Sequence, residues 1–482
     1  MDIFNHLIES LSKEEIQAFK LYALRKNANM ERKDLMLFDF AKKNKEDFDE
    51  DKIAENLYPN QSKNSFYRLK NRLTENILKS LSVHHFSTSD TQNIHHLLGL
   101  VQLFNKKGEF KLALHYLKKS EKKAISSESF EMLDIIYSEF IKISREFLSI
   151  NPEAYIKKRQ ANYKNLSKLR ELDNALSVVS YKLKTTQNFT SKKNEIIPLL
   201  ENTIGKLVKD KDVLSSIKFR TKIYRAVSQV LLSKREYVAL EKYLLQTFTD
   251  FETLNIFSEK NHDTKLQMTT YITNSMFKND KIKESLKWAD KLNNFMEEFK
   301  GALKSKYQIF YYNALVNNYN VIDKNKSIQI LEEIRVSKWM KTNPFLGIFV
   351  YINLALNWFD KFEYKKSIKN FQQLQLLDQY KNTDISLRFK WSIGELIVRY
   401  QLKDSEFLTF RIKQVQREFK DVLNEQSNLR DKQLIKILKG INGKKTIPPM
   451  TKELVRNFID QPGDDGELIN YAGWLKSLRI VD

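Results

Sequence analysis

The sequence predicts an all-α protein whose helices pack in consecutive pairs. Its 482 residues include 11 glycines and 7 prolines, too few to separate many strands, hairpins or long loops. Hydrophobic residues form 41% of the chain and recur at helical spacing. Because a chain of this length outgrows one hydrophobic core, it must divide into domains or extend as an array of repeated units.

Residues 1–86 predict a small helical N-terminal domain. Ile3, Phe4 and Leu7 begin a helical pattern, and the segment from Ser12 to Glu15 has the form of a capping box that opens a second helix. Further helical patterns follow, and Pro59 ends one of them because proline cannot continue the hydrogen-bond ladder. The polar stretch at 84–90 marks the end of this domain.

Residues 91–440 predict repeated helix pairs. The segment 97–124 reads as an apolar helix, a tight turn and a second helix, and its key residues are Leu97, Leu100, Phe104, Gly108, Phe110, Ala113 and Leu117. In their spacing these residues resemble the tetratricopeptide repeat. The positions equivalent to Ala113 are Leu240, Ser285, Ser327, Ser367 and Phe410, and those after Leu240 follow at intervals of 45, 42, 40 and 43 residues.

The resemblance implies an α-solenoid of about eight antiparallel helix pairs, each of roughly 42 residues. Two degenerate pairs are expected near Tyr155 and Pro198. The sequence departs from the family pattern, since the turn glycine is kept at Gly108 alone. At the position of Ala113, which is the marker position of each pair, the small residue becomes Leu240 and Phe410. The peptide-binding groove of the family therefore cannot be assigned to particular residues.

Residues 441–482 predict a linker followed by two short helices, at 452–460 and 467–480. In the second, Tyr471, Trp474 and Leu478 share one face, which should dock on the protein. We expect these helices to cap the last repeat, because the end of a repeat array must shield its apolar face. The alternative is a tail that another protein recruits.

Composition limits the location and the chemistry of the chain. Without cysteine there is no disulfide and no thiolate ligand or nucleophile. No stretch has the length and apolarity of a membrane span and the N-terminus does not resemble a signal peptide, so we expect a cytoplasmic protein with no membrane partner.

The chain has none of the common catalytic or phosphate-binding motifs. Its histidine pairs, His84-His85 and His95-His96, have no spacing that would direct them to one metal ion. We therefore expect a non-enzymatic protein without a cofactor or a metal.

A helix-turn-helix at 53–81 is a candidate nucleic-acid site. Arg68, Lys70 and Arg72 lie near the start of the would-be recognition helix, where such proteins place the side chains that contact DNA. Residues 63–86 have a net charge of +4, but residues 1–86 together reach only +1. An ordinary helical bundle with a charged exposed face explains the same pattern.

Most of the formal charge of +22 lies in the repeats. Two clusters are candidates for a basic partner-binding face, namely Lys157, Lys164 and Lys168, and Lys218, Arg220 and Arg225. The leading hypothesis is a protein–protein interaction scaffold that binds a protein or peptide. The basic clusters favour an acidic partner. The alternative is a nucleic-acid-linked regulator that joins the N-terminal helix-turn-helix to a repeat domain that senses a signal.

Overall fold

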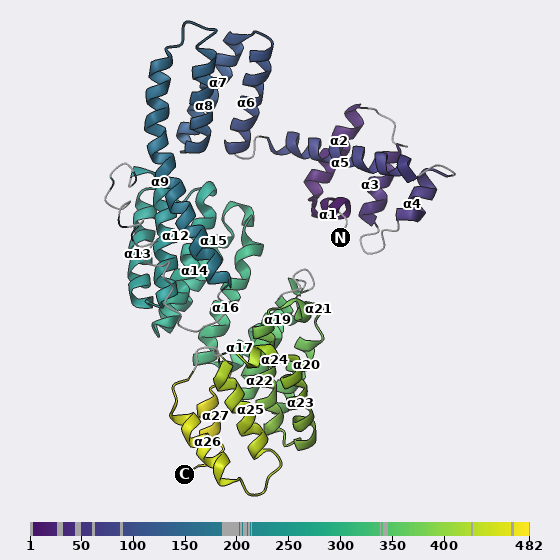
Figure 1. Ribbon diagram of the computed structural model, residues 1–482, viewed down its shortest axis with the longest axis vertical. Coiled ribbons are helices and arrows are strands. Elements are labelled where there is room, and N and C mark those ends of the chain that lie inside the picture. The colour runs from purple at the N-terminus through teal and green to yellow at the C-terminus, as the bar shows by residue number, and fades with distance from the viewer. Residues whose placement is uncertain are drawn as a thin grey trace. The chain divides into compact units, whose positions relative to one another are not determined.

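The computed structural model describes residues 3–26, 32–43, 50–59, 63–86, 90–185, 202, 205, 210, 213, 215–337, 339–340, 346–425, 428–463 and 467–481. Within these residues the regular secondary structure is helical, without a strand (Figure 1). The predicted all-α class is therefore confirmed. The chain divides into two compact units, Met1–Arg170 and Glu171–Asp482.

The first unit begins with five helices around their own apolar core. They are α1 (Ile3–Ser10), α2 (Lys13–Lys26), α3 (Lys33–Lys43), α4 (Glu50–Leu57) and α5 (Lys63–His85). Phe19 and Phe38 lie at the centre of this core with ring centroids 4.8 Å apart. The buried residues of α5, among them Leu69, Leu73 and Ile77, repeat at helical spacing and give this long helix one apolar face.

The capping box at the start of α2 is confirmed. The backbone N–H of Ser12 donates to Oε2 of Glu15 at 2.6 Å, and the backbone N–H of Glu15 donates to Oγ of Ser12 at 3.2 Å. Two backbone donors that the helix cannot satisfy are thus paired reciprocally, which fixes where α2 begins.

The rest of the first unit contains the helix pair that was clearest in the sequence. The pair is α6 (Asp90–Lys106) and α7 (Phe110–Ser126). It is followed by α8 (Phe130–Ile143) and α9 (Pro152–Thr185), and the division between the units falls within α9. The tight turn between α6 and α7 contains Gly108 at a φ of +72°, a conformation that costs glycine little. The expected pair near Tyr155 is instead the long helix α9. Pro198 lies outside the described residues.

The second unit continues with packed consecutive helices. They are α12 (Ile217–Lys234), α13 (Tyr237–Thr253), α14 (His262–Lys278), α15 (Ile282–Met296), α16 (Lys304–Ile322), α17 (Lys324–Val336), α19 (Leu346–Asp360), α20 (Tyr364–Gln375), α22 (Ile385–Gln401) and α23 (Ser405–Glu418), with the short elements η1 (Glu259–Asn261), η2 (Glu298–Gly301) and α21 (Asp378–Asn382) between them. The first helices of the pairs begin at residues 217, 262, 304, 346 and 385, so their starts are 45, 42, 42 and 39 residues apart. This arrangement is compatible with a helical-repeat fold.

The marker position of each pair is the fourth residue of its second helix. Ala113, Leu240, Ser285, Ser327 and Ser367 all occupy this position, and each has 0% of its surface exposed. The assignment of Phe410 as the next marker is wrong, because Phe410 is 63% exposed and the fourth residue of α23 is the fully buried Leu408. The side chain of Asp404 caps α23 by accepting a hydrogen bond from the backbone N–H of Phe407, and this cap sets the register.

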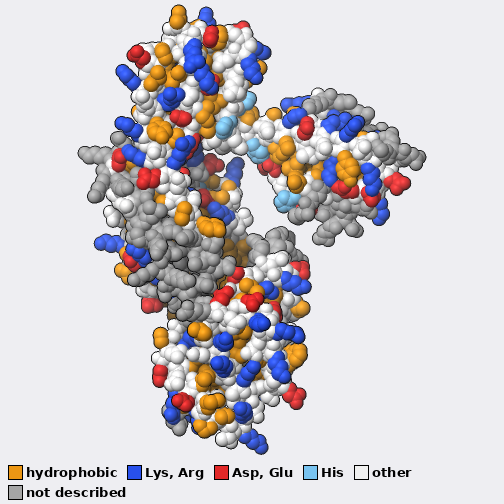
Figure 2. All heavy atoms as spheres, viewed as in Figure 1, with side chains coloured by type: hydrophobic (Ala, Val, Ile, Leu, Met, Phe, Trp, Pro, Cys, Tyr) orange, Lys and Arg blue, Asp and Glu red, His pale blue; other side chains and the backbone are white. Residues whose placement is uncertain are grey.

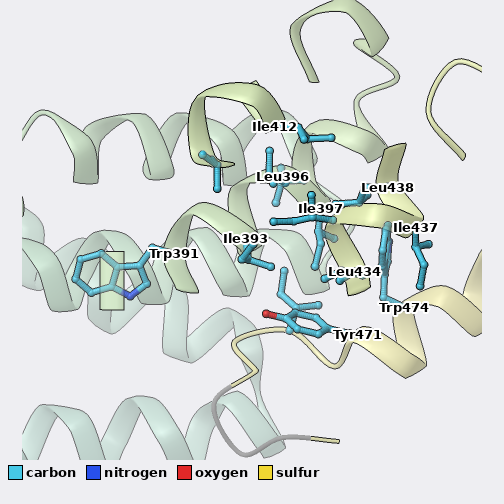
Figure 3. Packing of buried hydrophobic residues seen from close by; sticks show 14 of the residues in the cluster. Trp391, Ile393, Leu396, Ile397, Ile412, Leu434, Ile437, Leu438, Tyr471 and Trp474 are labelled. Carbon is cyan, nitrogen blue, oxygen red and sulfur yellow. The ribbon is translucent and has the colours of Figure 1, made fainter. Parts of the chain in front are cut away.

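The C-terminal part of the second unit has the largest apolar core. It adds α24 (Lys420–Leu423), α25 (Leu429–Ile441), α26 (Pro449–Asp460) and α27 (Tyr471–Ser477). Figure 3 shows Tyr471 and Trp474 of α27 beside Leu434 and Ile437 of α25. Leu478 is partly buried against the same core. No helix in the described ranges combines the length and the apolarity needed to cross a bilayer.

Candidate functional site

The candidate nucleic-acid residues on α5 lie in different surroundings. Arg68 and Arg72 are exposed, one helical turn apart, and form no ion pair with the described part of the chain. The ammonium group of Lys70 instead pairs with Glu50 of α4, and its side chain is only 12% exposed. Lys63 pairs with Asp51 of α4 at 2.7 Å. Acidic residues of α4 therefore form ion pairs with two of the basic side chains near the start of α5.

The basic cluster on α9 is one helix face. Lys157, Lys164 and Lys168 lie seven and four residues apart, and the first two are exposed while Lys168 is half-buried. The neighbouring Lys158 points elsewhere and pairs with Glu121 of α7 at 2.8 Å. On the face that Figure 2 shows, lysine and arginine side chains are scattered rather than gathered into one patch.

The basic cluster on α12 does not form a single face. Lys218 and Arg225 lie seven residues apart and share one side of the helix, whereas Arg220 lies two residues from Lys218 and points elsewhere. The Nη2 atom of Arg225 is 3.9 Å from Oδ2 of Asp263 and 3.4 Å from Oγ1 of Thr264. Arg225 thus contacts the start of α14, a helix whose later residues line a pocket with α15 and α16.

A pocket of about 250 Å³ lies between α14, α15 and α16. Asn274, Asn313 and Asn317 contribute polar groups to it, Phe277 and Phe310 contribute apolar surface, and the buried Leu292 lies at its base. The three asparagine side chains form no hydrogen bond with the described residues. Carboxamide groups that can both donate and accept therefore face solvent next to an apolar surface.

The polar residues of this pocket occupy equivalent positions in successive first helices. Asn274 precedes the marker Ser285 by 11 residues and Asn317 precedes the marker Ser327 by 10. One turn earlier, Thr270 precedes its marker by 15 residues and Asn313 precedes its own by 14. In α12 the same counting from Leu240 gives Gln229 at 11 residues and Arg225 at 15. Arg225 therefore has the helix position that the pocket residues have in the next two pairs.

A fixed link holds the two walls of the pocket together. Nδ2 of Asn318 in α16 donates to Oγ of Ser285 in α15 at 2.9 Å, and that hydroxyl donates to the carbonyl oxygen of Thr273 in α14 at 2.9 Å. Tyr271 lines the same pocket, and burial raises the pKa of its hydroxyl. The hydroxyl is therefore protonated at neutral pH, as in an unperturbed tyrosine.

A charged cluster lies at the start of α14. Asp263 accepts a hydrogen bond from the hydroxyl of Tyr307 at 2.9 Å and pairs with Lys306 and Arg225. Burial alone would raise the pKa of the Asp263 carboxyl, but hydrogen bonds from Lys306 and Tyr307 lower it. Two cations thus share one carboxylate, so these three side chains together have a net positive charge.

The sequence did not single out this pocket, although one signal was present. Phe310, Asn313 and Asn317 are spaced three and four residues apart and so predict one helix face with an aromatic and two amide groups. Single asparagines on a helix are ordinary surface residues, so the pattern gains meaning only when Asn274 of α14 lies opposite. Within the described residues, no group of three histidine, aspartate or glutamate side chains could hold a metal ion.

No protein-family model matches the chain, and a search of curated proteins finds no significant match. The similarity to tetratricopeptide repeats therefore rests on the spacing of residues within this sequence.

Proposed function

We propose that this chain is a non-enzymatic interaction scaffold whose tetratricopeptide-like helix pairs stack as an α-solenoid and bind an extended segment of a partner protein along α12, α14 and α16. The supporting observation is the pocket between α14 and α16, where Asn274, Asn313 and Asn317 present carboxamides without a partner among the described residues.

The size of the pocket favours a side chain over a small-molecule cofactor. Sites for drug-sized ligands usually enclose about 300–1,000 Å³, whereas this pocket has about 250 Å³. Phe277 and Phe310 provide the apolar surface that an aliphatic or aromatic side chain would cover. One anchoring side chain of a longer ligand fits this volume.

The arrangement of the amides suits an extended backbone. Packed helix axes lie about 8–10 Å apart, and an extended chain advances about 3.3 Å per residue. Carboxamides on neighbouring first helices, such as Asn274 and Asn317, would then reach peptide groups about three residues apart. Such side chains can satisfy both the N–H and the C=O of a bound backbone without selecting its sequence.

The nearby cations favour an acidic residue in the partner. Arg225 and Lys306 share the single carboxylate of Asp263, so a ligand carboxylate would complete the pairing. Such a pair would be partly exposed and would contribute about 0.2–1 kcal/mol. The charge would therefore orient the ligand, and the apolar anchor would supply most of the affinity.

The experiment is a selection of displayed random peptides on the full-length protein, followed by binding titrations of the enriched peptides. We expect enriched peptides with an apolar anchor and an acidic residue, and we expect N274A/N313A/N317A to weaken their binding at least about tenfold, or 1.4 kcal/mol. The matched control is Asn294→Ala, at an exposed asparagine of α15 outside the pocket. Equal binding by the triple variant and the wild type would contradict the proposal.

A further inference from the structure

The first unit has a second surface, between α2 and α5, that the proposed function does not use. An open depression of about 490 Å³ is lined there by Tyr22 of α2 and by Leu78, Val83 and neighbouring residues of α5. Leu78 is 48% exposed and Val83 is 58% exposed. Two aliphatic side chains on one stretch of a well-packed helix are thus left to solvent, although the opposite face of α5 is buried.

Unpaired cations continue this surface toward the start of α5. Arg68 and Arg72 are exposed, and neither forms an ion pair with a described residue. Glu75 is the single acidic residue of α5, and its carboxylate already pairs with Lys79 at 3.4 Å. The exposed face of α5 therefore has two arginines near its start and two aliphatic side chains, interspersed with Lys79 and Ser82, near its end.

Helix α2 adds a third cation on the same side. His85 at the end of α5 contacts Glu15 near the start of α2, and Tyr22, two turns further along α2, lines the depression with Leu78, so α2 advances toward the start of α5. Arg25 lies one turn beyond Tyr22, in the direction that leads toward Arg72. Arg25 is exposed and has no ion pair with the described residues.

We propose that the α2–α5 surface docks an acidic amphipathic helix of a partner protein. Its apolar side chains would cover Tyr22, Leu78 and Val83, and its carboxylates would pair with Arg25, Arg68 and Arg72. Residues 68 to 83 span about 22 Å of helix, so the partner helix would be about four turns long. This surface lies in the first unit and is independent of the pocket in the second.

Charge complementarity and the apolar depression together favour a protein partner over nucleic acid. A phosphate backbone would use Arg68 and Arg72 but would gain nothing from exposed leucine and valine next to them. Lys70 and Lys63 already pair with Glu50 and Asp51, so the start of α5 offers few free cations for the many phosphates of a DNA backbone. An amphipathic helix uses both kinds of surface.

The test uses the full-length protein and three fluorescent model helices that share one leucine face and differ in having glutamate, glutamine or lysine beside it. Fluorescence anisotropy is measured across a salt series for the wild type, R68E/R72E and L78S/V83S. The matched control is K157E/K164E, which reverses two exposed lysines of α9 without touching this surface. Circular dichroism checks that each variant keeps the helical content of the wild type.

We expect the glutamate helix to bind the wild type most tightly and the lysine helix least tightly. Both R68E/R72E and L78S/V83S should weaken the glutamate helix by about tenfold or more, and K157E/K164E should leave it unchanged. Absence of saturable binding by the glutamate helix, or equal binding by R68E/R72E and the wild type, would overturn the proposal.

A random DNA duplex serves as the competing probe. Tight, salt-dependent DNA binding that R68E/R72E weakens and L78S/V83S leaves intact would overturn the proposal in favour of a nucleic-acid site. Weak DNA binding that is equal in all variants would support the protein partner.

Discussion

Asn318 donates a hydrogen bond from Nδ2 to Oγ of Ser285 at 2.9 Å, and both residues are fully buried. The bond joins the first helix of one pair to the second helix of the pair before it. Asn357 and Ser327 repeat the contact one pair later, at 3.3 Å. Where serine occupies the marker position it fits between closely packed helices, and its hydroxyl adds a directional link between successive pairs.

We predict that Ser285→Ala loosens the contact between α14, α15 and α16 by about 1–2 kcal/mol. It removes two buried hydrogen bonds, the one that Asn318 donates to the hydroxyl and the one that the hydroxyl donates to the carbonyl oxygen of Thr273. The Nδ2 atom of Asn318 keeps its bond to the carbonyl oxygen of Ala314, which limits the loss. Amide hydrogen exchange in α14–α16 measures the local opening free energy. Ser305→Ala, at an exposed serine of α16, is the control, and an equal effect of both substitutions would contradict the role of the bond.

A second prediction compares Leu408 with Phe410 on α23. Leu408 is fully buried and Phe410 is 63% exposed. Leu408→Ala should cost about 2–5 kcal/mol, the range for a leucine cavity in a core, whereas Phe410→Ala should change the stability by less than about 0.5 kcal/mol. The urea midpoint of the second unit measures both, and a larger loss for Phe410→Ala would restore the register predicted from the sequence.

These residues show how far the sequence predicts the fold. Helical periodicity and scarce glycine and proline predicted the helices, and the Ser12–Glu15 spacing predicted a cap that the hydrogen bonds confirm. The sequence did not predict the register of α23 correctly, because Phe410 has the hydrophobic character of a core residue. The helix start is set by the cap at Asp404, which is a local hydrogen bond. Periodicity measures spacing within a helix, and a cap decides where that spacing begins.

The candidate site was less predictable than the fold. Arg225 was singled out for its charge, whereas the helix position that it shares with Thr270 and Asn313 was not recognised from the sequence. Lys70 was singled out with Arg68 and Arg72, yet it pairs with Glu50 from another helix. Sequence reveals which residues share a helix face, whereas partners that come from distant segments depend on packing between helices.

A third prediction concerns the buried charges in the C-terminal core. Glu395 accepts hydrogen bonds from Arg399 at 2.6 Å and from Arg411 at 2.8 Å, and the side chains of all three are at most 10% exposed. Glu395→Ala would leave two guanidinium groups buried without their counter-charge and should destabilise this region by about 3–5 kcal/mol.

The matched control for the buried cluster is Glu406→Ala on α23, since Glu406 is exposed and forms no ion pair with the described residues. Thermal unfolding followed by circular dichroism would compare the two variants. A loss of stability for Glu395→Ala no larger than that for Glu406→Ala would show that the arginines find other partners.

The last prediction concerns acid sensitivity of the N-terminal helices. Hydrogen bonds from the backbone of Ser12 and from His85, whose Nε2 atom lies 2.7 Å from Oε1 of Glu15, lower the pKa of the Glu15 carboxyl below its ordinary value of 4.5. As the pH falls below about 4.5, the unfolded chain takes up this proton before the folded one does. The stabilisation from Glu15 is therefore complete above that pH and is lost as the pH falls toward the lowered folded pKa.

Glu15→Gln should accordingly lower the stability of α2 at neutral pH and flatten its loss below about pH 4.5, because glutamine has no proton to gain. Glu14→Gln is the matched control, since Glu14 is exposed in the same turn and has no ion pair with the described residues. Amide exchange in α2, corrected for the intrinsic pH dependence of exchange, measures both variants between pH 3 and 7. A pH profile of Glu15→Gln that parallels the wild type would show that another carboxyl controls the acid response.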